Sequence, residues 1–128
     1  MSSRKGGQRE YRVGEKLVEL GYRVAFIKGS GQRRINKDRR AGFEASVVAG
    51  DLLAFYEGTS GLPDLIVEVG GIGKRGRGAL CELDKLRPGR HLPLVARCHR
   101  RGWKFKGGTS GWSSSLIAAI SAAKDLYV

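Results

Sequence analysis

The spacing of apolar residues along the chain predicts alternating helices and strands. Apolar positions recur with helical spacing in residues 9–20, 79–86 and 116–127. Short runs rich in apolar, β-branched and aromatic residues predict strands at 22–27, 51–56, 64–69, 92–98 and 103–105. Helices interspersed with strands in this order predict a single α/β domain in which helices flank a central mixed β-sheet.

Glycine and serine residues mark the ends of these elements. Gly21 is a suitable stop for the first helix, and the serines at 113–115 can cap the last one. We expect the main domain to span residues 1–106, followed by a linker and C-terminal helix over 107–128. The apolar face of that helix (Leu116, Ile117, Ile120 and Ala123) is expected either to complete the core or to meet a partner subunit.

Two acidic residues frame the predicted hairpin formed by strands 51–56 and 64–69. Asp51 opens the first strand and Glu68 lies near the end of the second. In an antiparallel pair these two ends lie side by side. Two neighbouring carboxylates need a compensating cation or proton, and oxygen ligands suit Mg²⁺ or Mn²⁺. The alternative is that both acids simply mark strand ends at the surface.

A third acid lies on the apolar face of the first helix. Glu10 precedes Val13 by three residues and Leu17 by seven, so it shares their stripe. An acid on an inward face needs a reason. It either contributes to a site with Asp51 and Glu68 or is stabilised by the helix dipole in the first turn.

The charge balance predicts a polyanionic partner. The chain has 128 residues, with 24 Lys and Arg against 12 Asp and Glu, for a net charge of +12. Nucleic acid is the leading candidate, and no basic amphipathic helix or membrane-length segment favours a membrane. Residues 31–49 are predicted to form a basic insertion or mobile arm that binds phosphates, with cations at Arg33, Arg34, Lys37, Arg39 and Arg40.

Cysteine usage and the N-terminal residues predict an intracellular, cytoplasmic protein. Cys81 and Cys98 have neither zinc-site spacing nor the density of a disulfide scaffold. The first seven residues are not followed by the apolar core of a signal peptide.

Several segments, taken in order, resemble the archaeal-type Holliday-junction resolvases of the PD-(D/E)XK nuclease superfamily. The likeness covers about the first 105 positions. Its opening is R-K-G-G-Q-R-E at residues 4–10, similar to that family's R-K-G-x-x-x-E pattern. The other matching segments are L-G-Y-R-V at 20–24, G-S at 29–30, D-L-L-A at 51–54, I-V-E-V at 66–69, P-L-V-A at 93–96 and G-W-K-F at 102–105.

The resemblance implies a restriction-endonuclease-like homodimer that nicks four-way DNA junctions in recombination and repair. Water would attack a phosphodiester with the help of Mg²⁺, or Mn²⁺ in its place. Asp51 and Glu68 would hold the metal, Glu10 would assist directly or through a water, and Ser30 would lie near the scissile phosphate. The residues expected to follow DNA backbones in a four-way junction or other branched duplex are Arg4, Lys5, Arg9, Arg33, Arg34, Lys37, Arg39, Arg40, Arg75 and Arg77.

One departure from the family pattern bears on catalysis. The lysine of the family's E-x-K motif falls at position 70, where this chain has Gly70. Lys74 is expected to replace it, with Lys28 and Lys85 as alternatives. Gly70 also favours a second hypothesis, a non-catalytic or weakly catalytic branched-DNA-binding module on a nuclease scaffold.

A third hypothesis is a nuclease for nicked or mismatched duplex that uses Asp64 as the motif aspartate. The distance along the strand argues against it, because strand rise separates positions 64 and 68 by roughly 13 Å.

Overall fold

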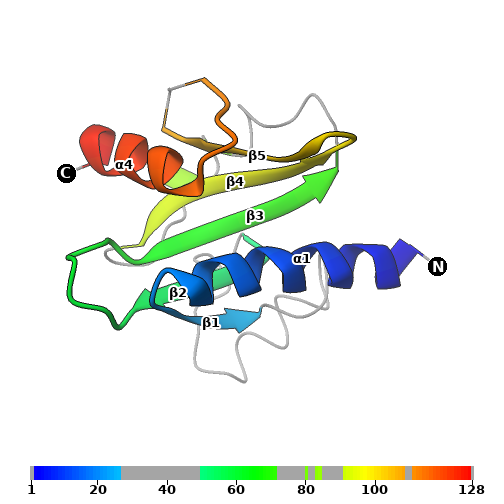
Figure 1. The fold of residues 1–128 in the computed structure, drawn as a ribbon, viewed down its shortest axis with the longest axis horizontal. Coiled ribbons are helices and arrows are strands. Elements are labelled where there is room, and N and C mark those ends of the chain that lie inside the picture. Colours follow the sequence, from blue (N-terminus) through cyan, green and yellow to red (C-terminus); the bar gives the residue numbers. More distant parts are fainter. Residues whose placement is uncertain are drawn as a thin grey trace.

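The computed structural model describes residues 2–26, 50–71, 80, 83–84, 91–108 and 111–127 (Figure 1). Its elements are α1 (Ser2–Glu19), β1 (Tyr22–Phe26), β2 (Leu52–Tyr56), β3 (Leu65–Gly71), β4 (Leu92–His99), β5 (Gly102–Gly107) and α4 (Leu116–Tyr127). Leu80, Leu83 and Asp84 are also helical. The predicted order of helices and strands is confirmed, but α1 begins at Ser2 and not near residue 9. No helix in the described ranges has the length and apolar character needed to cross a membrane.

The five strands form one mixed sheet in the order β1-β2-β3-β4-β5. β1, β2 and β3 pair antiparallel, β3 and β4 pair parallel, and β5 returns antiparallel to β4. The predicted hairpin is therefore present, with Leu52 opposite Val67. Parallel strands need a crossover connection, and the helical residues between β3 and β4 lie on that connection.

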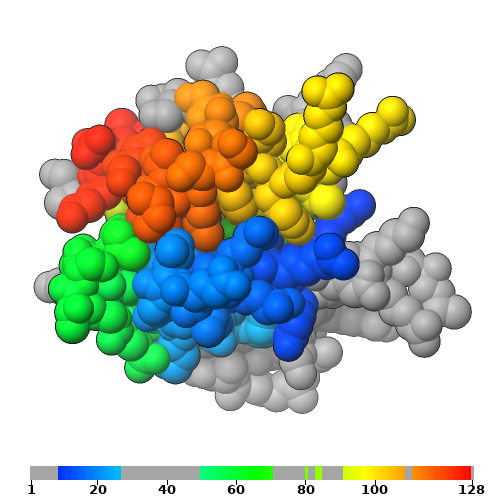
Figure 2. Space-filling model, viewed as in Figure 1, coloured from blue at the N-terminus to red at the C-terminus, as the bar shows by residue number. Residues whose placement is uncertain are grey.

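The two faces of the sheet carry separate apolar clusters. Val13 and Leu17 of α1 and Ile120 of α4 pack over one face, with strand residues such as Leu52 and Leu94. The opposite face carries a smaller cluster that consists of Leu53, Ile66, Leu80, Leu83 and Val95. In Figure 2, α1 and α4 together cover the first face. The sheet thus has helical residues on both faces, as the α/β prediction requires.

The C-terminal helix completes the core, the first of the two roles expected for it. Ala119, Ile120 and Ala123 are buried in the same cluster as α1. The expected apolar face is slightly rotated, because Ile117 is 44% exposed. The Ser115 hydroxyl accepts a hydrogen bond from the Ala118 amide at 3.2 Å, which confirms the predicted serine cap.

Glycine ends α1 as predicted. Gly21 has a φ of 103°, a left-handed conformation that suits glycine, and its amide donates to the Val18 carbonyl at 3.0 Å. The chain can therefore turn directly from α1 into β1. This turn brings Tyr22, the first residue of β1, beneath the helix.

Tyr22 is a buried phenol at the start of the sheet. It is 4% exposed, and its hydroxyl donates to the Pro63 carbonyl at 2.7 Å. Burial raises the pKa of the Tyr22 phenol well above its ordinary value, and the nearby Asp64 and Tyr56 add to that rise. The phenol thus stays protonated in the folded chain at a pH where it ionises in the unfolded chain.

We expect the free energy of unfolding to fall as the pH rises above about 10, the ordinary pKa of tyrosine. A folded-state pKa above the unfolded value gives stabilisation that is complete below the unfolded pKa and is lost toward the folded pKa. When the Tyr22 phenol is ionised in the unfolded chain and protonated in the folded chain, the two states differ by one proton. The free energy of unfolding then falls by about 1.4 kcal/mol per pH unit. Urea unfolding between about pH 9 and about pH 11 measures it.

Tyr22→Phe is expected to reduce this alkaline loss, although it lowers stability at neutral pH by removing the bond to Pro63. Tyr11→Phe is the control, because Tyr11 is 61% exposed, and it should keep the wild-type pH dependence. Equal alkaline slopes in Tyr22→Phe and the wild type would contradict the assignment.

Candidate metal and nucleic-acid site

Asp51 and Glu68 are neighbours across the β2–β3 pair, as the sequence predicted. The register pairs Leu52 with Val67, and one step further along it brings Asp51 beside Glu68. The Asp51 amide donates to the Val67 carbonyl at 2.7 Å, and the Val69 amide donates to Asp51 Oδ2 at 2.7 Å. Asp51 is therefore fixed to both residues that flank Glu68. We call this end of the sheet, where β2 begins and β3 and β4 finish, the carboxylate end.

Strand alternation determines which face of the sheet carries the Glu68 side chain. Ile66 lies in the cluster with Leu80 and Leu83, so the Glu68 side chain projects to the face that carries this cluster. A side chain at position 70 would project to the same face. Arg97 follows Val95 by two residues on β4, and Val95 belongs to the same cluster, so the Arg97 side chain also projects to this face. Glu68 is half-buried there, with a side chain 33% exposed.

Arg97 is a buried cation beside Glu68. It is 6% exposed, and its Nη2 atom lies 4.0 Å from Glu68 Oε2. That separation exceeds a hydrogen bond, so the two groups interact as charges. A second contact at 3.4 Å joins Arg97 Nη1 to the Ala96 carbonyl. Arg97 was not among the site residues predicted from the sequence.

Glu10 lies on α1, which covers the face opposite to that of Glu68. It is half-buried, and the next residue, Tyr11, stacks on Phe26 with ring centroids 6.4 Å apart. Phe26 pairs with Leu52, so this turn of α1 lies near the carboxylate end. Across the described ranges, however, no three His, Cys, Asp or Glu side chains are grouped closely enough to hold a metal. The expected set of Glu10, Asp51 and Glu68 is thus not gathered into one three-acid cluster.

Many predicted site residues lie outside the described part of the chain. These are Ser30, Lys74, the cations of the 31–49 insertion (Arg33, Arg34, Lys37, Arg39 and Arg40), and Arg75 and Arg77. Lys28 and Lys85, the other two proposed replacements for the lysine, are also outside it. Arg4, Lys5 and Arg9 belong to α1, and Arg9 is half-buried.

Two elements whose sequences contain cationic residues lie at the carboxylate end. The N-terminal turns of α1 lie at the end of the sheet where β3 finishes (Figure 1). The β4–β5 turn lies at the same end, because β4 runs parallel to β3, and it carries the exposed Arg100 and Arg101. Long side chains from this yellow segment project from the surface in Figure 2. This turn was not predicted from the sequence as a DNA-binding segment, although residues 97–106 contain several Arg and Lys and no acid.

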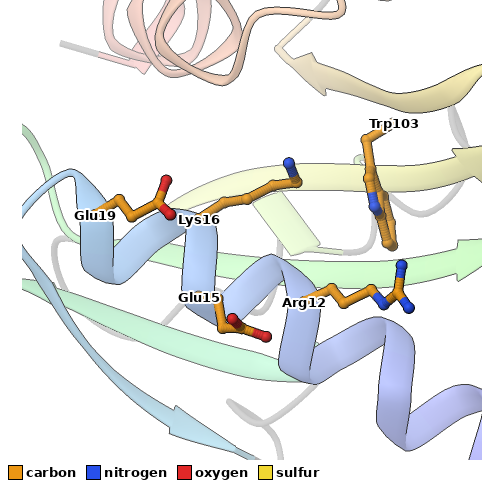
Figure 3. A pocket seen from close by; sticks show the side chains of 5 residues that line it. All are labelled: Arg12, Glu15, Lys16, Glu19 and Trp103. Carbon is orange, nitrogen blue, oxygen red and sulfur yellow. The ribbon is translucent and has the colours of Figure 1, made fainter.

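A separate groove lies between α1 and β5 (Figure 3). It has a volume of about 460 Å³ and is lined by Arg12, Glu15, Lys16, Glu19 and Trp103. Its charges are of both signs, so it lacks the uniform positive potential that favours a polyanion. None of the predicted site residues lines it.

Asp64 has a structural role at the other end of β3. Its Oδ1 accepts a hydrogen bond from the Tyr56 amide at 2.7 Å, just before β3 begins. Asp64 thus resembles Asp51 in binding a backbone amide, but it is far along the strand from Glu68. This position does not favour the hypothesis in which Asp64 is the motif aspartate.

Two neighbouring carboxylates at the carboxylate end suit a hard cation. Mg²⁺ is usually bound through one or two carboxylates together with substrate phosphates and waters, so a third acid is not required. The Asp51 carboxylate is held in place by the Val69 amide, which fixes one oxygen donor before any ligand arrives.

Comparisons with protein-family models, curated proteins and solved structures find no match to this chain.

Proposed function

We propose that this protein is a metal-dependent, structure-selective endodeoxyribonuclease that nicks four-way DNA junctions, with a restriction-endonuclease-like fold. The observation that carries the proposal is the pairing of Asp51 with Glu68 at the carboxylate end. The resemblance of the sequence to junction resolvases supports it, as does the net charge of +12. The corresponding processes are DNA recombination and repair in the cytoplasm.

In this proposal Asp51 and Glu68 hold Mg²⁺, or Mn²⁺ in its place. When bound, the metal polarises the phosphodiester and activates water. The hydrogen bond from Val69 to Asp51 orients one carboxylate, and the β2–β3 register keeps the other beside it. Glu10 and Ser30 remain proposed contributors, and Lys74 is one candidate for the cation of the nuclease pattern. The pairing of Asp51 with Glu68 does not depend on any of the three.

The arrangement of charge supports a branched-duplex substrate. Arg100 and Arg101 on the β4–β5 turn and the N-terminal turns of α1 flank the same end of the sheet. Such contacts bind phosphates without reading bases, so the shape of the DNA would set the preference. A homodimer would present two such sites to the two strands of a symmetrical junction.

Two observations favour the second candidate, a branched-DNA-binding module without strong catalysis. Gly70 lacks the cationic side chain of the nuclease pattern. In addition, Glu10 does not join Asp51 and Glu68 in a three-acid cluster among the described residues. Both candidates predict tight, salt-sensitive junction binding, so only cleavage separates them.

The deciding experiment compares a labelled four-way junction with a linear duplex of the same arm sequences. The protein is incubated with each in Mg²⁺, Mn²⁺, Ca²⁺ or EDTA. We expect paired nicks in the junction with Mg²⁺ or Mn²⁺, and uncut duplex. Tight junction binding with no cleavage in any metal would favour the binding module, and equal binding to both DNAs would contradict both candidates.

A further inference from the structure

The side chain of Arg97 occupies the space beside Gly70. The parallel β3–β4 register places Arg97 directly opposite Gly70. A Cβ built on Gly70 would lie 3.1 Å from Arg97 Nη1 and 3.6 Å from its Cζ. The guanidinium on β4 therefore lies over the backbone of β3, where a side chain at position 70 would begin.

The surroundings of Arg97 explain why a buried cation is tolerated there. A buried charge is costly unless an opposite charge compensates it. Glu68 lies two residues before Gly70 on the same face of β3, and its carboxylate is 4.0 Å from the Arg97 guanidinium. A guanidinium carries five N–H donors, and the hydrogen bond from Arg97 Nη1 to the Ala96 carbonyl uses only part of that capacity.

We infer that Arg97 supplies, from β4, the cation that the nuclease pattern would place at position 70 of β3. Its guanidinium would face the scissile phosphate beside the metal that Asp51 and Glu68 would hold, and it would stabilise the charge that develops on that phosphate during hydrolysis. Arginine stays protonated in proteins, so Arg97 acts by charge and does not abstract a proton. This inference rests on the proposed nuclease function and replaces Lys74, Lys28 and Lys85 as the source of the charge.

The test moves the cation from one strand to the other. Arg97→Ala removes it, Gly70→Lys adds a lysine while Arg97 is retained, and the double variant carries only the lysine. The double variant has room for the new side chain, because the atoms nearest to a Cβ at position 70 are those of Arg97. Arg23→Ala is the matched control, since Arg23 also lies on a strand 3.8 Å from a glutamate, Glu57, but is largely exposed.

Three quantities are measured for each variant: the single-turnover cleavage rate with saturating protein, the junction Kd in EDTA, and the melting temperature. Arg97→Ala is expected to slow cleavage about 100-fold, the effect of losing one well-placed charge donor. Its Kd should change no more than that of Arg23→Ala. The double variant should recover about 10-fold or more of the lost rate, because it restores a cation at the same place.

Two results would overturn the role of Arg97. One is wild-type cleavage by a folded Arg97→Ala variant. The other is a double variant that regains the wild-type melting temperature without regaining cleavage, which would make Arg97 a structural partner of Glu68. If Arg97→Ala fails to fold, the folded double variant decides alone by its rate. Absence of cleavage by the wild type itself would instead overturn the proposed function.

Discussion

Asp51→Asn is expected to slow Mg²⁺-dependent junction cleavage about 1,000-fold, since losing a metal-binding carboxylate removes several kcal/mol of transition-state stabilisation. The amide oxygen of Asn can still accept the hydrogen bond from Val69, so the fold at the carboxylate end should be kept. The variant therefore removes the charge and little else. Junction binding in EDTA should stay close to that of the wild type.

Asp64→Asn is the control for this change. Asp64 accepts a backbone hydrogen bond from Tyr56 at 2.7 Å, the same distance as the bond from Val69 to Asp51. Both residues are half-buried and both precede a strand of the same hairpin. We expect similar changes in melting temperature for the two variants, but full cleavage by Asp64→Asn. Equal cleavage rates for the two variants, measured under single-turnover conditions, would exclude Asp51 from the chemistry.

The largest stability effect is expected at Gly107, where β5 passes α4. A Cβ at this position would overlap the Ala119 carbonyl oxygen and lie 3.0 Å from the Ala123 Cβ. The overlapping atom belongs to the helix backbone, so α4 has to move as a unit. Gly107→Ala should therefore lower the free energy of unfolding by about 3 kcal/mol, at the upper end of typical overpacking costs.

Gly111→Ala provides the matched control. Gly111 is exposed, a Cβ there would meet nothing within 4 Å, and its φ is not positive. We expect its urea midpoint to equal or slightly exceed that of the wild type, because alanine restricts the unfolded chain. A Gly107→Ala midpoint as high as that of Gly111→Ala would show that α4 is not held closely against β5.

The neighbouring positions of Asp51 and Glu68 could be predicted because they depend on local structure. A hairpin brings the start of one strand to the end of the next whatever the rest of the fold does. Two apolar runs separated by a Gly/Pro-rich turn were enough to infer it. The C-terminal helix was predicted for a similar reason, since a serine cap and helical spacing define it within its own segment.

Arg97 could not be placed from the sequence, because its neighbours come from another strand. It lies in a run that predicts a buried strand, and only the parallel register with β3 sets it opposite Gly70. The three candidate lysines, Lys28, Lys74 and Lys85, lie near position 70 in the chain or near the ends of predicted elements. The available signal was that a cation inside a buried strand must have a partner.

The position of Glu10 relative to the sheet also depends on packing between distant elements. Helical spacing correctly put Glu10 on the stripe of Val13 and Leu17, but it does not say which face of the sheet the helix covers. α1 packs on the face opposite to Glu68. Helical spacing also placed Val18 among the apolar positions of this helix, yet in the structure Val18 is 58% exposed.

The contact between Phe105 and Ser113 limits how copies of this chain can associate. Ser113 exchanges two backbone hydrogen bonds with Phe105, at 2.7 and 2.8 Å, on the side of β5 that faces away from β4. The middle of this outer edge is thus already paired by the chain's own polypeptide. A second copy would find no continuous row of amides and carbonyls there on which to add a strand. Any association of two copies would therefore have to use side chains or another edge of the sheet. The same pairing protects the middle of β5 from fibril-like strand addition.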